Sequence, residues 1–386
     1  MPDQLTPDLV ELRDRLQRFI DDDLRPLDEQ VVAGGMTERE AAPQVAKRSR
    51  ELGFFQLTQP KEFGGTEAGP LALTVVRETL AAANLRVTRS VLGPGPGVLR
   101  NTTGELRERY LEPLMRGEKR SAFAFTEPSG PDARPTKARR DGDVLVVNGH
   151  KPYVTGGALA DFYSVFVRVE GESGDQPGGS TAMVIVERDT EGLTLHPEFS
   201  TMDGATHCSL SFDEMRVPVA NVIGGARGIG EGVGRALGGI GEMRLGVAAQ
   251  ACGTAMWVVD YTLKHIQQPH RSGVPLGERE QVRAIFGQMV AETYVARATL
   301  YRTARLAETG ADVLNEGSIA KLQASEAAGR VVDQAIQLTG GQALIAGHPL
   351  ERLYRVTRSW RLAEGASEML RVSIARGLLE FDSGRV

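Results

Sequence analysis

Two glycine-rich stretches have a composition that could hold the phosphates of a nucleotide. They are Gly93-Pro94-Gly95-Pro96-Gly97 and the segment 228–234. Backbone N–H groups bind a phosphate when such glycines follow the spacing GxGxxG between a strand and a helix. Neither stretch completes that spacing after a predicted strand. The sequence therefore argues against a Rossmann-type dinucleotide site.

Other widespread catalytic motifs are also missing from the sequence. It contains no Walker A sequence, no GxSxG elbow and no HExxH, which removes the common NTPase, serine-hydrolase and zinc-protease interpretations. Cys208 and Cys252 lie in separate segments without CxxC or metal-ligand spacing. We therefore expect two buried free thiols, no disulfide and no metal site.

The chain divides into three blocks whose secondary structure would position any catalytic residues. The first block, residues 1–120, is predicted to be helical. Thr6 followed by Pro7 predicts an N-cap with proline at the first helical position. Leu9, Leu12, Leu16, Phe19 and Ile20 then follow at helical spacing and must be buried on one face. Further helices are predicted over 38–52, 71–83 and 105–115.

The second block, residues 121–226, shows the alternation typical of strands. Strands are predicted over 144–147, 163–169, 181–186 and 208–212. Asn148-Gly149 predicts a hairpin turn after the first of these strands. The segment 171–180 is predicted as a surface loop, and 224–234 as the linker out of this block.

The third block, residues 227–386, is helical again, with long segments predicted over 278–308, 318–338 and 368–379. Gly340 and Gly341 end the middle segment. The expected fold is mostly α with a central β-domain, and its expected domains are 1–120, 121–226 and 227–386.

Composition limits the partners. The chain has 386 residues, 41% of them apolar and 25% charged, with a net charge of −5. Its basic residues are dispersed, so nucleic acid and anionic membranes are not expected partners. No stretch approaches the length of a membrane span and no secretory leader is evident, so we expect a cytoplasmic protein.

Several motifs, in one order along nearly the whole chain, resemble those of acyl-CoA dehydrogenases. The segments are FAFTEP at 123–128, NGHKPYVT at 148–155, LSFDEMRVPVANVI at 210–223, Arg271 after a long helix, QLTGG at 337–341 and EGASE at 364–368. The resemblance implies an N-terminal helical domain, a small β-barrel or sandwich domain and a C-terminal four-helix bundle. It also implies FAD as the cofactor.

A flavin ring needs apolar or aromatic walls and a few polar groups at its edge. The resemblance places Tyr153 beside one face of the ring, Thr155 near N5, and Phe125 and Thr126 at the ring edge. Ordinary strand packing or a turn would also explain these residues. The full cofactor set that the resemblance implies is Phe125, Thr126, Tyr153, Val154, Thr155, Arg271, Gln281, Gln337, Gly340, Gly341, Ala366, Ser367 and Glu368.

The same resemblance assigns the remaining polar residues. Arg271 would bind the pyrophosphate of FAD in a neighbouring subunit, for which the planar guanidinium is suited. Gln337 and the two glycines after it would lie near the ADP part, although a helix C-cap explains those glycines equally well. Arg244 and Gly365 would lie near the substrate thioester, with a structural ion pair as the alternative for the arginine.

The implied reaction removes a proton from the α-carbon of an acyl thioester and a hydride from the β-carbon. A carboxylate in a desolvated pocket suits the proton, and flavin N5 suits the hydride. Glu364, in the EGASE segment, is the candidate base, and the segment 245–259 contains no Asp or Glu to rival it. A surface or helix-capping glutamate is the alternative interpretation.

Departures from the family pattern leave further alternatives open. The usual GAGSD is shortened to Ser129-Gly130-Pro131-Asp132, Arg271 is not followed by Phe-Gly, Gln342-Ala343 follow the two glycines, and Ala366 and Tyr153 replace Thr and Trp. These changes keep open a non-catalytic partner subunit of a heteromeric acyl-CoA dehydrogenase. A flavin oxidase or monooxygenase on the same fold is a further alternative. The resemblance also implies a CoA or carrier-protein thioester, an electron-transfer flavoprotein as acceptor, and a homodimer or homotetramer.

Overall fold

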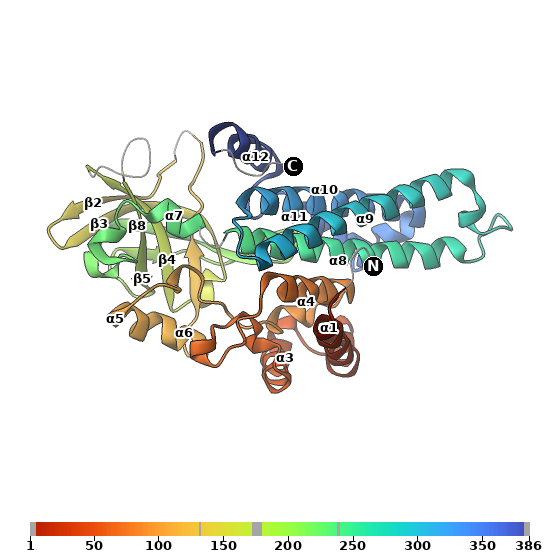
Figure 1. Ribbon diagram of the computed structural model, residues 1–386, viewed down its shortest axis with the longest axis horizontal. Helices are drawn as coiled ribbons and strands as arrows, with labels where there is room; N and C mark the ends of the chain where they lie inside the picture. Colours follow the sequence, from red (N-terminus) through yellow and green to blue (C-terminus); the bar gives the residue numbers. More distant parts are fainter. Residues whose placement is uncertain (1–4, 131–132, 172–179, 238–239, 382–386) are drawn as a thin grey trace. The chain divides into compact units, whose positions relative to one another are not determined.

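The computed structural model describes residues 5–130, 133–171, 180–237 and 240–381 (Figure 1). These residues form two compact units. The first is drawn from Met1–Thr58, Gly65–Gly93 and Ile240–Val386, and the second from Gln59–Gly64 and Pro94–Gly239. The chain thus leaves the first unit and returns to it after the strands.

The N-terminal part of the first unit consists of α1 (Pro7–Phe19), α2 (Arg25–Val32), α3 (Glu38–Leu52) and α4 (Pro70–Ala82). Thr6 is the extended N-cap of α1 and Pro7 its first residue, as the sequence predicts. Leu16, Phe19 and Ile20 are buried in one core with residues of α3 and α4. The expected buried face of the first helix is therefore present.

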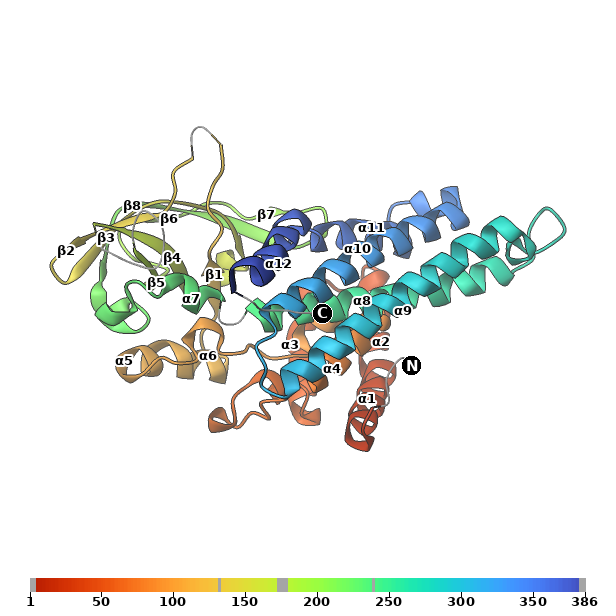
Figure 2. The same ribbon diagram turned by 45° about the horizontal axis from the view of Figure 1, so that its top comes forward.

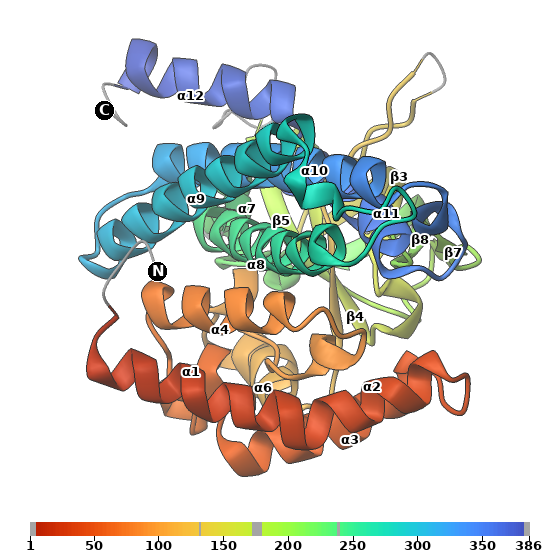
Figure 3. The same ribbon diagram turned by 90° about the vertical axis from the view of Figure 1, so that its right-hand side faces the viewer.

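The C-terminal part of the first unit is a bundle of α8 (Ile240–Gln267), α9 (Glu280–Glu308), α10 (Leu314–Thr339) and α11 (Pro349–Trp360), followed by α12 (Ser367–Phe381). The long helices run beside one another, and α4 packs against α8 (Figures 2 and 3). Buried alanines such as Ala248, Ala328 and Ala335 let the helix backbones approach closely.

The second unit is built on one mixed sheet. Its strands are β1 (Ser121–Ala124), β2 (Lys137–Asp141), β3 (Val144–Thr155), β4 (Phe162–Glu170), β5 (Ser180–Glu187), β6 (Leu193–Leu195), β7 (Phe199–Ser200) and β8 (Thr206–Pro218). The strand order is β1-β4-β2-β3-β8-β6, with β5 on β4 and β7 on β8. Two short helices, α5 (Gly104–Leu106) and α6 (Glu112–Arg116), belong to this unit, as does α7 (Gly232–Leu237).

The predicted hairpin at Asn148-Gly149 is wrong. These residues lie inside β3, at a register irregularity opposite β8, and Asn148 binds Glu214 across that irregularity through its side chain. Gly149 has a φ of 139°, and a Cβ there would meet the backbone of Thr136 at 2.5 Å. The glycine thus permits a close backbone approach within a long strand. The hairpin turn lies earlier, between β2 and β3.

The segment 224–234 is not a free linker. Gly230 N–H donates to Thr181 O, and Val233 N–H donates to the Thr181 hydroxyl, so the segment is tied to β5. Its glycines let the segment pack closely against the strand and do not serve as flexible joints. A Cβ at Gly232 would lie 2.4 Å from Ala182 N. The predicted loop at 171–180 lies almost wholly outside the described residues.

The order of helices, β-domain and helical bundle confirms the predicted architecture. The predicted domain boundaries after residues 120 and 226 stay a prediction. Both cysteines are buried free thiols, and the described residues hold no cluster of His, Cys, Asp or Glu able to bind a metal. Among those residues, no helix has the length and apolar composition that a membrane span requires.

Candidate active site

Glu364 lies in the turn between α11 and α12, in an unusual backbone conformation. Its φ is 53°, which is in the left-handed region, and Gly365 follows with a φ of 105°. A non-glycine residue in that region costs about 1–2 kcal/mol, so the rest of the turn must hold it there. Strain of this kind often marks a residue whose placement matters for function.

Two buried cations hold this turn from neighbouring helices. Arg244 of α8 donates from Nε to Glu364 O at 3.3 Å, and its Nη1 donates to Ser318 Oγ of α10 at 2.8 Å. Lys321 of α10 donates to Gly365 O at 2.6 Å. Arg244 is predicted to contact substrate, and the structure brings it to Glu364. Lys321 carried no sequence signal and was missed.

The start of α12 is also fixed. Ser367 N–H donates to Arg361 O, and its hydroxyl donates to Glu326 Oε1 at 2.7 Å. Arg361 Nε donates to the same carboxylate oxygen at 3.0 Å. The Ser367 hydroxyl, predicted to contact the cofactor, thus has a structural partner. Ala366 is partly buried in this turn and Glu368 is exposed on α12.

Burial and the neighbouring charges shift the pKa of Glu364 in opposite directions. Burial raises the pKa of the Glu364 carboxyl, while the positive charges of Arg244 and Lys321 lower it. Burial, together with the nearby Arg244 charge, lowers the pKa of Lys321 to about 8. A carboxylate with a raised pKa between two cations is suited to accept a proton from carbon near neutral pH.

We expect Lys321→Met to move the rising limb of the pH–rate profile to higher pH. Glu364, the predicted base, would act only when deprotonated, and the lysine charge lowers the pKa of this carboxyl. Removing that charge therefore raises the pH at which half of the enzyme carries the active carboxylate. The measurement is kcat/KM against pH, with Lys264→Met, at an exposed position on α8, as the matched control. An unchanged limb would show that the Lys321 charge does not reach the base.

A second group of predicted site residues lies at the other end of the bundle. Arg271 and Gln281 are exposed around the α8–α9 connection, and Gln337, Gly340 and Gly341 are exposed where α10 ends. At about 1.5 Å per residue, the 23 residues from Arg244 to Gln267 along α8 span roughly 35 Å. One chain therefore cannot bring this group to its own Glu364.

A third group belongs to the second unit and lies on β3 and after β1. A bulge shapes it, because Pro152 and Tyr153 together oppose a single residue of β8. Lys151 and Val154 consequently both point into the core, whereas Tyr153 is 55% exposed and Thr155 is also exposed. The Val154 side chain is fully buried, so a cofactor could contact only the backbone of this residue.

Buried Lys151 ties the segment after β1 to β3. Its Nζ donates to Phe125 O at 3.0 Å and to the Glu127 carboxylate, and Glu127 also accepts from Thr136 N. Thr126 lies between these two anchors, exposed, and its hydroxyl has no partner among the described residues. The sequence places Lys151 in a motif but does not reveal this positioning role.

These β-domain residues fit a flavin. Tyr153 and Phe199 are exposed aromatic rings 5.9 Å apart, and the adjacent Thr155 offers a hydroxyl on the same exposed side. An exposed aromatic surface beside a polar group is what a planar, partly polar ring system requires. The residues at hand thus supply the walls and polar edge expected of a flavin site.

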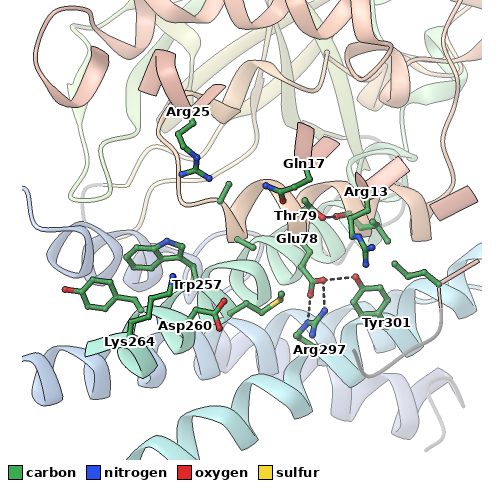
Figure 4. Close-up of a pocket in the computed structure, with 16 residues that line it drawn as sticks. Arg13, Gln17, Arg25, Glu78, Thr79, Trp257, Asp260, Lys264, Arg297 and Tyr301 are labelled. Atoms are coloured by element: carbon green, nitrogen blue, oxygen red, sulfur yellow. Dashed lines mark hydrogen bonds and ion pairs between the residues drawn. The ribbon is translucent and has the colours of Figure 1, made fainter. Parts of the chain in front are cut away.

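A separate cavity of about 560 Å³ lies in the first unit between α1, α4, α8 and α9 (Figure 4). On one side, Arg297 and Tyr301 both donate to the buried carboxylate of Glu78, the arginine at 2.7 and 2.9 Å and the tyrosine at 2.7 Å. None of the predicted site residues lines this cavity. It is therefore not the predicted site.

Comparison with known proteins gives matches over nearly the whole chain. The N-terminal, middle and C-terminal domain models of acyl-CoA dehydrogenase match residues 6–118, 122–215 and 230–379. A 3-(aryl)acrylate reductase of Clostridium sporogenes is 31% identical, over 96% of this chain and 98% of its own. The mitochondrial short-chain specific acyl-CoA dehydrogenase of Rattus norvegicus is 31% identical, over 86% of this chain and 82% of its own.

The solved structures agree. An acyl-CoA dehydrogenase of Bacillus anthracis in complex with FAD has a TM-score of 0.80 and 25% identity, covering 99% of this chain and 69% of its own. FAD, the predicted cofactor, is the cofactor of this family. The order of motifs, the fold and the matched domain models agree, and the chain belongs to the acyl-CoA dehydrogenase family, whose members are oxidoreductases acting on CH–CH groups.

Proposed function

We propose that this protein catalyses the FAD-dependent α,β-dehydrogenation of an acyl thioester, with Glu364 as the base that takes the α-proton. The main support for this proposal is the environment of Glu364. Its side chain is partly buried, its left-handed turn is held by Arg244 and Lys321, and burial raises the pKa of its carboxyl. The charges of Arg244 and Lys321 also act on this carboxyl, which a solvent-exposed capping glutamate would not require.

The chain's own residues have separable tasks in this proposal. Glu364 holds the proton that leaves the α-carbon, and Arg244 and Lys321 balance the charge of its carboxylate. Tyr153 and Thr155, aimed outward by the β3 bulge, hold the flavin ring, and Lys151 positions Thr126 at its edge. When bound, FAD accepts the hydride from the β-carbon.

The names of two relatives favour a second candidate, the reverse reaction. The C. sporogenes relative is a 3-(aryl)acrylate reductase, and a 30% identical protein of Anaerotignum propionicum is an acryloyl-CoA reductase. The same groups serve both directions, because the acid that protonates the α-carbon in reduction is the base in oxidation. The test incubates the enzyme with saturated and with α,β-unsaturated CoA thioesters, with an artificial electron acceptor or donor. Mass spectrometry of the products assigns the direction, and no conversion of either would contradict both candidates.

We further propose a homodimer or homotetramer with an electron-transfer flavoprotein as electron acceptor. Arg271 and Gln337 lie at the end of the bundle away from Glu364. An active site that combines these two residues with Glu364 therefore needs a second chain. A 28% identical relative of Acetobacterium woodii is a subunit of a caffeyl-CoA reductase–Etf complex, which supports the proposed acceptor. A cytoplasmic location stays a prediction.

We expect Arg271→Ala to weaken FAD binding by about 10–100-fold. Arg271 is exposed and has no partner among the described residues, so it is available to phosphate oxygens. A charged hydrogen bond of this kind contributes about 1.5–3 kcal/mol. The measurement is the FAD dissociation constant of the apoprotein, followed by flavin fluorescence. Arg302→Ala, also exposed but near the C-terminal end of α9, is the control, and equal constants for both variants would remove Arg271 from the site.

A further inference from the structure

A row of three side chains crosses the exposed end of the sheet in the second unit. Thr155 of β3 pairs with His207 of β8, and His207 pairs with Phe199 of β7 on its other side. Directly paired residues of neighbouring strands project on the same face of a sheet. The imidazole of His207 therefore lies between the hydroxyl of Thr155 and the ring of Phe199.

Contacts within the row are specific. His207 Nδ1 and Thr155 Oγ1 are 3.1 Å apart and share a hydrogen bond. The His207 ring also meets Tyr153 edge-on, with centroids 6.2 Å apart, and packs on Phe199 at 5.9 Å. His207 thus joins the two exposed aromatic rings and the hydroxyl assigned above to the flavin. Neither His207 nor Phe199 stood out in the sequence, because their neighbours come from other strands.

The hydrogen bond to His207 restricts which atoms the Thr155 hydroxyl can offer to a second partner. An unpaired hydroxyl rotates, and it can offer either its hydrogen or its lone pairs to a neighbour. If His207 Nδ1 accepts the hydroxyl hydrogen, Thr155 presents lone pairs to the exposed side. If Nδ1 carries a hydrogen and donates it, Thr155 presents its own hydrogen there. The first tautomer fixes the hydroxyl hydrogen, and the second occupies one lone pair and leaves the hydrogen available to the exposed side.

Oxidised and reduced flavins make opposite demands on such a group. Nitrogen N5 carries a lone pair in the oxidised ring and a hydrogen in the reduced ring, so an outward hydrogen favours the first and outward lone pairs favour the second. We propose that His207 is a positioning residue that orients the Thr155 hydroxyl and so sets the relative affinity of the protein for oxidised and reduced FAD. This rests on the proposed contact between Thr155 and the flavin.

The test measures the midpoint potential of bound FAD and the FAD affinity of the apoprotein in His207→Phe, Thr155→Val and the double variant. Phenylalanine keeps an aromatic ring in contact with Tyr153 and Phe199 but cannot bind the hydroxyl. We expect His207→Phe to change the ratio of affinities for the two redox forms at least tenfold, which is about 30 mV for a two-electron couple. An upward shift would show that Nδ1 donates in the native protein, and a downward shift that it accepts.

The double variant separates positioning from general packing. In the Thr155→Val background, His207→Phe should shift the potential by less than a third of its effect alone, because no hydroxyl remains to be oriented. His207→Asn, which places a polar atom near the position of Nδ1, should restore most of the native potential. The matched control is His196→Phe, since His196 binds Ser211 in the same unit outside the row.

The outcomes distinguish this inference from the proposed function. If Thr155→Val changes neither the FAD affinity nor the potential, the proposed flavin contact itself is wrong. If Thr155→Val changes them but His207→Phe does not, or if His207→Phe has the same effect in both backgrounds, the contact stands and the positioning role of His207 is refuted.

Discussion

Replacing Glu364 by glutamine should lower the rate of α-proton removal by about 10²–10⁴-fold, the usual contribution of a positioned general base. Glutamine keeps the size of the side chain and a carbonyl oxygen, but it cannot accept the proton. The fold of the turn should survive, because Arg244 and Lys321 bind backbone carbonyls of Glu364 and Gly365 rather than the carboxylate. Single-turnover reduction of the bound flavin by an acyl-CoA is the direct measurement.

The matched control for this variant is Glu380→Gln, the same change on α12 at an exposed glutamate paired with Arg376. Both variants should bind FAD and unfold at the same temperature as the unchanged protein. A Glu364→Gln protein that keeps more than about a tenth of the rate would assign the base to another residue. A protein that has lost FAD would show that Glu364 has a structural role instead.

Replacing Arg297 by methionine should lower the free energy of unfolding by about 3–5 kcal/mol. Arg297 and Glu78 form a buried ion pair with exposed side-chain fractions of 11% and 6%. Removing one partner of such a pair leaves the other as an uncompensated buried charge. Tyr301 alone would then face the carboxylate. Chemical denaturation followed by circular dichroism measures the loss, with exposed Arg302→Met on the same helix as the control.

The double variant Glu78→Gln with Arg297→Met tests the reason for that loss. It removes both charges and leaves the glutamine oxygen to accept from Tyr301, so it should unfold less easily than Arg297→Met alone. Equal losses in the single and double variants would mean that the arginine contributes by packing. A loss below about 0.5 kcal/mol in Arg297→Met would mean that the cavity of Figure 4 lets water solvate the carboxylate.

Helices could be predicted where their ends carry local signals. The helix predicted over 38–52 has those bounds, since Thr37 and Glu40 form a capping box at its start and Gly53 is left-handed at its end. The hairpin at Asn148-Gly149 could not be judged locally. Its glycine serves a close approach to Thr136, a residue of another segment. A turn signal and a bulge signal look alike in a single sequence.

Some residues of the candidate site could also be predicted from the sequence, and others could not. Glu364 and Arg244 could be predicted because the resemblance to the family covers both, and the structure joins them through a hydrogen bond. Lys321, Lys151 and His207 could not, because each acts through a partner that is distant in the sequence. A buried lysine has no periodic signature of its own. Only the packing shows that its charge faces a carboxylate or a backbone carbonyl.

The proposed dehydrogenation is tested most simply by the visible spectrum of the purified protein before and after anaerobic addition of a panel of acyl-CoA thioesters of different length and branching. We expect a flavin spectrum that bleaches with at least one of them, and that stays yellow with the same thioester in Glu364→Gln. A yellow protein that no thioester bleaches, or a colourless protein that does not take up FAD, would contradict it.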